Sequence, residues 1–124
     1  MPERHVRAIR GATTVTADTP DAIRLATQAL LTELTRRNAI VPADVISALF
    51  TVTNDLTSEF PARAARDLGW LEVPLLCTVE IPVPGALARC VRVLLHIEST
   101  RARAEIEHVY LDGARVLRPD LLRD

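Results

Sequence analysis

The chemistry available to this sequence centres on one arginine in an otherwise aliphatic strand. Residues 90–98 read CVRVLLHIE and alternate strictly, so successive side chains lie on opposite faces. One face carries Val91, Val93, Leu95 and Ile97, and the other carries Cys90, Arg92, Leu94, His96 and Glu98. A charge in mid-strand is costly unless water, a carboxylate or an anionic ligand meets it. Arg92 is therefore the first candidate site residue.

Glu80, Arg10 and Tyr110 are the next candidates, together with Arg63 and Arg66, which are three residues apart and share a helical face. No nucleophile is paired with a base, and the sequence contains neither a phosphate loop nor a dinucleotide fingerprint. The set suits the binding of a small polycarboxylate and the stabilisation of charge that shifts within it, without a cofactor or a covalent step. The alternatives are a structural Glu80–Arg92 strand pair and solvated surface arginines.

Four strands are expected to position these residues. A short strand at Val6–Ile9 runs into Arg10 and Gly11, where a glycine marks a tight passage or a positive φ. Residues 45–53 form a β-branched strand, with a helix over 44–49 as the alternative. Residues 75–81 and 90–98 are separated by a short Pro/Gly connection. This spacing predicts neighbouring antiparallel strands with Glu80 and Arg92 within reach of each other.

One long helix is expected to cover the aliphatic face of the sheet. Thr19, Pro20 and Asp21 form a helix start, with an N-cap hydroxyl, a proline at the first position and an acid in the first turn. Apolar residues then recur at helical spacing until Asn38. A second helix of one or two turns is expected within residues 59–70. Residues 108–118 suggest a small β-hairpin around Asp112-Gly113.

Length and composition indicate a single domain over residues 1–124 of an ordinary globular protein. The chain is 48% hydrophobic and 25% charged, with a net charge of −1, so neither nucleic acid nor a membrane surface is an expected partner. Residues 1–11 lack the apolar core of a signal peptide, and no run is long enough for a membrane span, so a cytoplasmic location is expected. Cys77 and Cys90 are expected to be reduced thiols. The histidines lack metal-ligand spacing, and no metal is expected.

Several segments together resemble a known family. They are RAIRGATTV, FPARAARDLGW, VPLLCTVEI followed by PGALARCVRVLL, and HVYL followed by VLRPDL. In this order and spacing they resemble the monofunctional chorismate mutases of the AroH class, over Val6 to Leu121. The resemblance implies an α+β fold with a mixed five-stranded sheet packed on one long helix. It also implies a homotrimer that forms a pseudo-α/β barrel, with active sites between neighbouring subunits.

The resemblance further implies an isomerase of the shikimate pathway that converts chorismate to prephenate by a pericyclic rearrangement, at the branch leading to phenylalanine and tyrosine, without a cofactor. Arg10, Arg92 and Glu80 would be the catalytic residues, at the carboxylate, the breaking ether oxygen and the ring hydroxyl. The implied substrate-binding residues are Cys77, Tyr110, Leu75, Leu76, Leu117 and Arg118, and, from the neighbouring chain, Phe60, Ala62, Arg63 and Arg66. Arg63 stands where the family often has lysine, and Leu76 stands where a threonine is common.

Two other functions remain compatible with an arginine-lined cleft between subunits. One is a small trimeric imine or enamine deaminase, which would release ammonia. The other is a trimer that binds a metabolite without turning it over.

Overall fold

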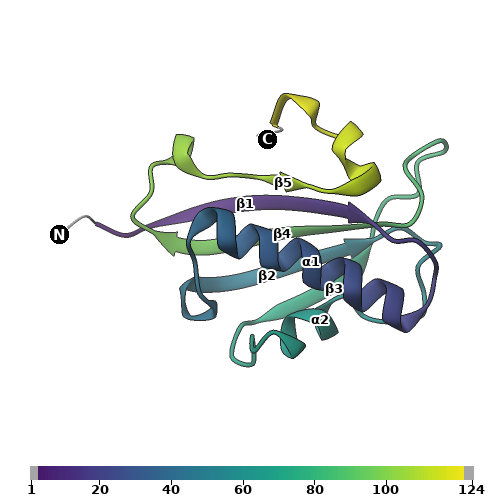
Figure 1. Cartoon of the computed structure of the whole chain (residues 1–124), viewed down its shortest axis with the longest axis horizontal. Helices are drawn as coiled ribbons and strands as arrows, with labels where there is room; N and C mark the ends of the chain where they lie inside the picture. The colour runs from purple at the N-terminus through teal and green to yellow at the C-terminus, as the bar shows by residue number, and fades with distance from the viewer. Residues whose placement is uncertain (1–2, 122–124) are drawn as a thin grey trace.

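The computed structural model describes residues 3–121 and contains a mixed five-stranded sheet in the order β3-β2-β4-β1-β5 (Figure 1). The strands are β1 (His5–Thr14), β2 (Val45–Val52), β3 (Leu75–Val79), β4 (Cys90–Ser99) and β5 (Val109–Tyr110). The central strand β4 is antiparallel to β1 and to β2, whereas β3 is parallel to β2 and β5 is parallel to β1. The expected α+β fold with a mixed five-stranded sheet is confirmed.

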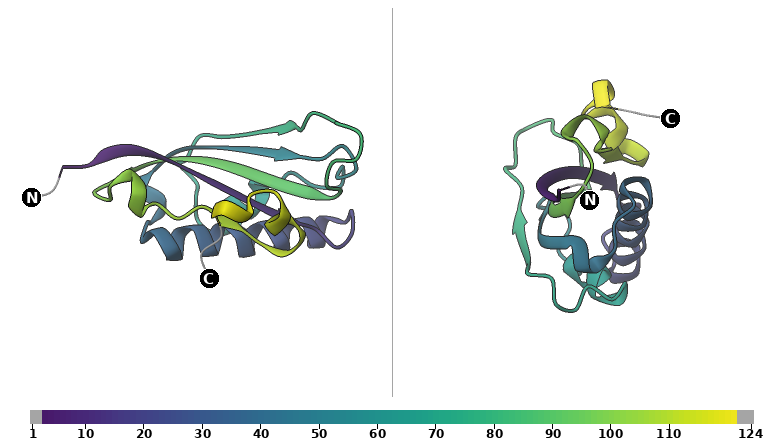
Figure 2. Two further views of the ribbon diagram at one scale, coloured as in Figure 1. Left: turned by 90° about the horizontal axis from the view of Figure 1, so that it is seen from above. Right: turned by 90° about the vertical axis from the view of Figure 1, so that its left-hand side faces the viewer.

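Helix α1 (Pro20–Asn38) lies along one face of this sheet, as its sequence predicts (Figure 2). The Thr19 hydroxyl accepts a hydrogen bond from the Ala22 backbone N–H and caps the helix start. Ala39 ends the helix in the left-handed conformation, with φ of 52°. The short helix α2 (Ala62–Asp67) packs beside α1, where the Asp67 carboxylate accepts hydrogen bonds from Arg24 and Gln28.

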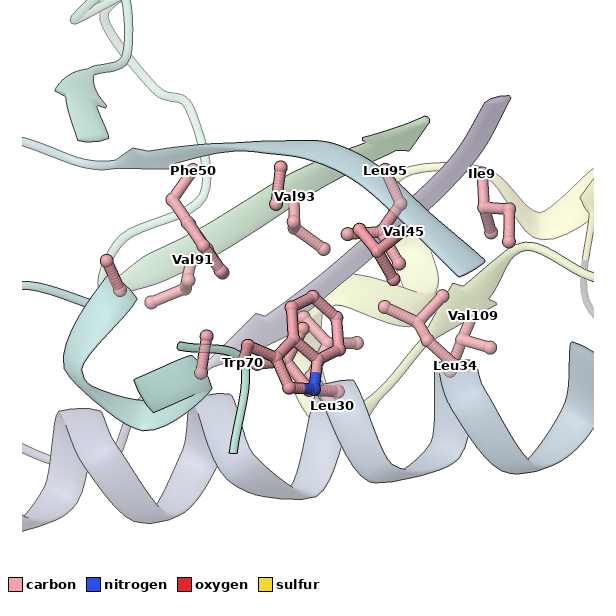
Figure 3. Close-up of a cluster of buried hydrophobic side chains, with 14 of the residues drawn as sticks. Ile9, Leu30, Leu34, Val45, Phe50, Trp70, Val91, Val93, Leu95 and Val109 are labelled. Carbon is pink, nitrogen blue, oxygen red and sulfur yellow. The ribbon is translucent and has the colours of Figure 1, made fainter. Parts of the chain in front are cut away.

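The main core fills the space between α1 and the sheet (Figure 3). From β4 it receives the predicted aliphatic face, in which Val91, Val93, Leu95 and Ile97 are all buried. Leu30 and Leu34 of α1 meet these side chains from below, and the Trp70 ring lies in the middle of the cluster. Side chains alternate along β4, so burial of its aliphatic face places Arg92 on the opposite face of the sheet.

Neither α-helix covers that opposite face, which we call the open face (Figure 2). Large apolar side chains are exposed there, among them Leu49, which is 40% exposed, and Leu76, which is 60% exposed. At one end, Ala12, Cys90, Tyr110 and Ala114 form a second, small buried cluster, against which Leu87 and Leu117 pack. The open face thus combines exposed apolar area with the strand that carries Arg92.

The predicted adjacency of the third and fourth strands is wrong, because β2 lies between them. β3 reaches β2 through the crossover that contains α2, which makes this pair parallel. The Pro/Gly segment is only part of a longer connection over residues 80–89 that passes across the end of β2. A proline-rich stretch between two strands therefore did not indicate a hairpin.

The end of β1 and the C-terminal region also differ from expectation. β1 runs through Gly11 to Thr14, so Arg10 lies within the strand and not at its end. The expected hairpin is wrong: Val109–Tyr110 pairs in parallel with β1, and Asp112–Val116 is a 3₁₀ helix. Asp112 has a φ of 51°, so the Asp-Gly pair redirects the chain into that helix instead of closing a hairpin turn.

Gly11 permits the close packing of β1 on α1, which is the tight passage expected from the sequence. A Cβ atom at this position would lie 2.8 Å from Leu34 Cδ1 and 3.2 Å from Leu30 Cδ1, and both leucines are fully buried. We therefore expect Gly11→Ala to lower the free energy of unfolding by about 1–3 kcal/mol through overpacking. Urea unfolding measures the loss, and Leu34→Val in the same chain should recover part of it. An alanine variant as stable as the parent chain would contradict this packing.

Candidate active site

Arg92 lies on the open face near the start of the central strand β4, level with Ala12 of β1 and Thr51 of β2. Its guanidinium forms an ion pair with Glu80, with 3.7 Å between Nε and Oε2, which is longer than a hydrogen bond. Within residues 3–121, the buried Nε atom has no hydrogen-bond partner. The side chain is 40% exposed, so the remaining donors are accessible from the open face. The exposed part of the guanidinium can therefore meet a ligand on the open face, whereas its inner side lies against Cys90 and Glu80.

Glu80 follows β3 directly and is held by β2. The Thr51 hydroxyl donates to Oε2 at 3.2 Å, and the backbone N–H of Ile81 donates to Oε1 at 3.0 Å. The Glu80 backbone N–H bonds to the Val52 carbonyl at 2.8 Å. Hydrogen bonds therefore fix the orientation of the Glu80 carboxylate through both of its oxygens. The expected meeting of Glu80 and Arg92 does occur, but across β2 rather than between neighbouring strands.

Arg10 and Tyr110 complete the group around a cavity of about 250 Å³, which we call the Arg92 cavity. Arg10 is exposed on β1, and Tyr110 on β5 is 6% exposed. The Arg10 backbone N–H donates to His108 Nδ1 at 3.0 Å, which ties β1 to the residue two positions before Tyr110. The lining residues are Arg10, Gly11, Ala12, Leu49, Thr51, Glu80, Arg92, Val93, Leu94 and Tyr110.

Leu117 and Arg118 lie next to this group. Leu117 packs on the small cluster that contains Tyr110. Arg118 forms a two-pronged ion pair with Asp120, with Nε–Oδ1 and Nη2–Oδ2 distances of 3.1 and 2.9 Å. This pair lowers the pKa of Asp120, with a smaller contribution from the nearby charge of Arg10. The end of the described chain therefore approaches the Arg92 cavity.

Most of the remaining predicted residues lie around α2, away from the Arg92 cavity. A separate cavity of about 350 Å³ is lined by Phe60, Pro61 and Cys77, among others. Phe60 is 69% exposed, Ala62 is buried, and Arg63 and Arg66 are exposed on the short helix. Cys77 faces the side of β3 opposite to Glu80, so one chain does not bring these two side chains together.

Leu75 and Leu76 likewise diverge on β3. Leu75 is half-buried against the main core, whereas Leu76 is exposed on the open face. The predicted site residues therefore form two groups in a single chain: one on the open face around Arg92, which includes Leu76, and one around α2 and the core-facing side of β3.

The chemistry of the first group is that of a preorganised polar pocket. Burial raises the pKa of both thiols, so neither Cys77 nor Cys90 is an activated nucleophile. Within residues 3–121, no three His, Cys, Asp or Glu side chains are grouped so as to hold a metal ion. What remains is two arginines, one oriented carboxylate and one phenol, which can bind carboxylates and oppose developing charges.

Comparison with known protein families gives a match over nearly the whole chain. Residues 6–121 match the family described as chorismate mutase type I. The chain belongs to this chorismate mutase family. It is 50% identical over 117 residues to "Chorismate mutase AroH" of Thermus thermophilus, covering 94% of this chain and 96% of that protein. It is 44% identical over 117 residues to "Chorismate mutase AroH" of Bacillus subtilis (strain 168), covering 94% and 92%.

A solved chorismate mutase from Clostridium thermocellum superimposes with a TM-score of 0.87 at 50% identity, covering 88% of this chain and 97% of that one. These findings confirm the family, the fold and the enzyme class expected from the sequence. No α-helix within residues 3–121 has the length and hydropathy needed to cross a membrane.

Sequence reasoning missed Thr51, the residue that orients Glu80. We expect Thr51→Val, which keeps the shape and removes the hydroxyl, to lower kcat of the mutase reaction about fivefold, since one hydrogen bond to a charged group is lost. Thr51→Ser keeps the hydroxyl and serves as the matched control, with kcat within about twofold of the parent chain. Steady-state kinetics measure both variants. Equal kcat values for the valine and serine variants would show that this hydrogen bond does not matter.

Proposed function

We propose that this chain catalyses the rearrangement of chorismate to prephenate in sites that two neighbouring copies of a homotrimer complete. The observation that carries the proposal is the accessible Arg92 guanidinium, which is placed beside Glu80 without being hydrogen-bonded to it. Membership of the family supplies the reaction. Both cysteines are free thiols, which fits the cytoplasmic location expected for the enzyme.

The first task of the site is to select a conformer. Chorismate must leave its extended form for a compact, chair-like one before its side chain can reach the ring. Arg10 and Tyr110 line the cavity beside Arg92 and would bind substrate carboxylates, with Arg118 at the adjacent wall. Clamping both carboxylates holds the reacting carbons close together and removes the entropic cost of that approach from the chemical step.

The second task is to oppose the charges of the transition state. The ether C–O bond breaks ahead of C–C bond formation, so negative charge grows on the oxygen and positive charge on the ring. No atom or proton leaves, because the reaction is an isomerisation. Arg92 would donate to the ether oxygen, and Glu80 would face the ring. Because both groups are fixed before the substrate binds, they stabilise these charges without reorganisation.

The two separated groups of residues support a site between copies. Arg63 and Arg66 are exposed on α2 and Phe60 is exposed just before it, and all three are absent from the lining of the Arg92 cavity. The open face around that cavity exposes Leu49 and Leu76, apolar area that another copy would remove from water. A neighbouring α2 placed over the open face would bring its arginines to an anionic substrate. The contact of Cys77 with the ring hydroxyl stays a prediction.

The role of Arg92 is tested with Arg92→Gln. We expect kcat to fall by about 10²–10³, the cost of losing one transition-state donor, while KM changes less than about threefold. Loss of chorismate absorbance with no added cofactor measures the rate, and a separate ammonia assay should stay negative. Arg103→Gln, at an exposed arginine outside the site, is the control and should leave both constants unchanged. Equal losses in kcat and in substrate affinity would count against transition-state stabilisation.

The shared site is tested by mixing two inactive variants. Arg92→Gln damages one group, and the double variant Arg63→Gln/Arg66→Gln damages the other. If neighbouring copies complete each site, trimers reassembled from an equal mixture should contain intact sites at about one quarter of positions. Activity of the mixture should therefore exceed the mean of its components. Mixing Arg92→Gln with Glu80→Gln, which damage the same group, should give no gain. A gain in neither mixture would contradict the shared site.

A further inference from the structure

Asp18, in the loop between β1 and α1, holds a segment far along the chain. Its carboxylate accepts hydrogen bonds from the backbone N–H groups of Thr57 and Ser58, at 2.9 and 3.1 Å, and from the Thr57 hydroxyl at 3.1 Å. The Ser58 hydroxyl also donates a hydrogen bond, to the Asp18 backbone carbonyl at 2.9 Å. Four hydrogen bonds thus connect two exposed loops that are about forty residues apart in sequence.

The held segment leads directly to Phe60 and α2. Thr57 and Ser58 are themselves exposed, so burial does not fix them, and the Phe60 backbone N–H bonds only locally, to the Glu59 carboxylate at 2.9 Å. The flanking residues Leu56 and Ala62 are buried and anchored in the core. Between these two anchors, the bonds to Asp18 determine where the chain runs, and hence where the exposed Phe60 ring projects.

The Asp18 contact is suited to a permanent positioning role. Its hydrogen bonds, led by the one from the Thr57 backbone, lower the pKa of the carboxyl group, so the group stays ionised at neutral pH. Hydrogen bonds to an ionised acceptor are stronger than those to a neutral one. Asp18 itself lines neither the Arg92 cavity nor the cavity beside Phe60.

We propose that Asp18 is a positioning residue for the mutase reaction: it fixes the 57–60 segment so that Phe60 and Arg63 can enter the site of the neighbouring copy. This inference rests on the proposed function, because only a site shared between copies gives these exposed residues a ligand. Its removal would loosen the part of the site that a neighbour supplies and leave the Arg92 group of the same chain intact. The expected consequence is weaker substrate binding with little change in the chemical step.

Three variants test the proposal. Asp18→Ala should raise KM about tenfold while kcat changes less than about threefold. Asp18→Asn keeps one oxygen for the two backbone N–H groups, and the Thr57 hydroxyl can accept from its amide, so KM should return to within about threefold of the parent value. Asp21→Ala, at an exposed carboxylate three residues away, is the matched control and should change KM less than about twofold. An unchanged KM in Asp18→Ala, or no rescue by asparagine, overturns the proposal.

Mixing experiments locate the damage. Asp18→Ala combined with Arg92→Gln should yield intact sites with the parent KM, because the two lesions fall in different groups. Asp18→Ala combined with Arg63→Gln/Arg66→Gln should not. If Arg92→Gln and Arg63→Gln/Arg66→Gln fail to complement each other, the shared site fails. If they complement, but the mixture of Asp18→Ala with Arg63→Gln/Arg66→Gln also yields sites with the parent KM, only the assignment of Asp18 fails. A second variant tests the same contact if Asp18→Ala does not fold. Ser58→Ala removes one of the four hydrogen bonds and should raise KM about twofold. An unchanged KM in Ser58→Ala overturns the proposal.

Discussion

The structure depends on one permanently charged group, the Arg92 guanidinium, whose charge must be compensated while part of the group stays available to a ligand. Arg92 is placed in the central strand, where its charge must be compensated but where full pairing would leave nothing for a ligand. The structure meets both conditions by holding Glu80 at 3.7 Å, close enough for electrostatic stabilisation and too far for a hydrogen bond. Thr51 and the Ile81 backbone supply the hydrogen bonds that the carboxylate needs instead.

The order of the strands in the sheet meets the same requirement, that the Arg92 charge is compensated without being fully paired. Inserting β2 between β3 and β4 separates Glu80 from Arg92 by one strand and places the Thr51 hydroxyl between them. A direct β3–β4 pair would bring opposite charges onto adjacent strands, where they pair closely. The single helix layer buries the aliphatic face of β4 and leaves the open face for the site and, as proposed, for neighbouring copies.

Local patterns predicted the elements but not their partners. Alternation over residues 90–98 assigned Arg92 to the face opposite the core, and the Thr19 cap placed the start of α1, because both signals are contained in a few neighbouring residues. The order of the strands depends on crossovers that the sequence does not encode locally, so neither the Pro/Gly segment nor the Asp112-Gly113 pair forms the hairpin turn that its residues predict. Thr51, His108 and Asp18 act through partners at least twenty-nine residues away, so no local pattern could reveal them. Residue types and spacing alone indicated Arg92, Glu80, Arg10, Tyr110 and the Arg63/Arg66 pair. The resemblance to a family added the other predicted site residues and every assigned role, and the structure adds their division into two groups.

The most direct test of the account is a crystal structure of the protein with a bound bicyclic ether dicarboxylate that mimics the chair-like transition state. The account predicts that the ether oxygen accepts a hydrogen bond from Arg92, that Arg10 and Tyr110 contact the carboxylates, and that Phe60 and Arg63 of a second copy close the site. A bound analogue that touches one copy alone, or an Arg92 side chain that remains paired with Glu80 and turned away from the ether oxygen, would contradict it.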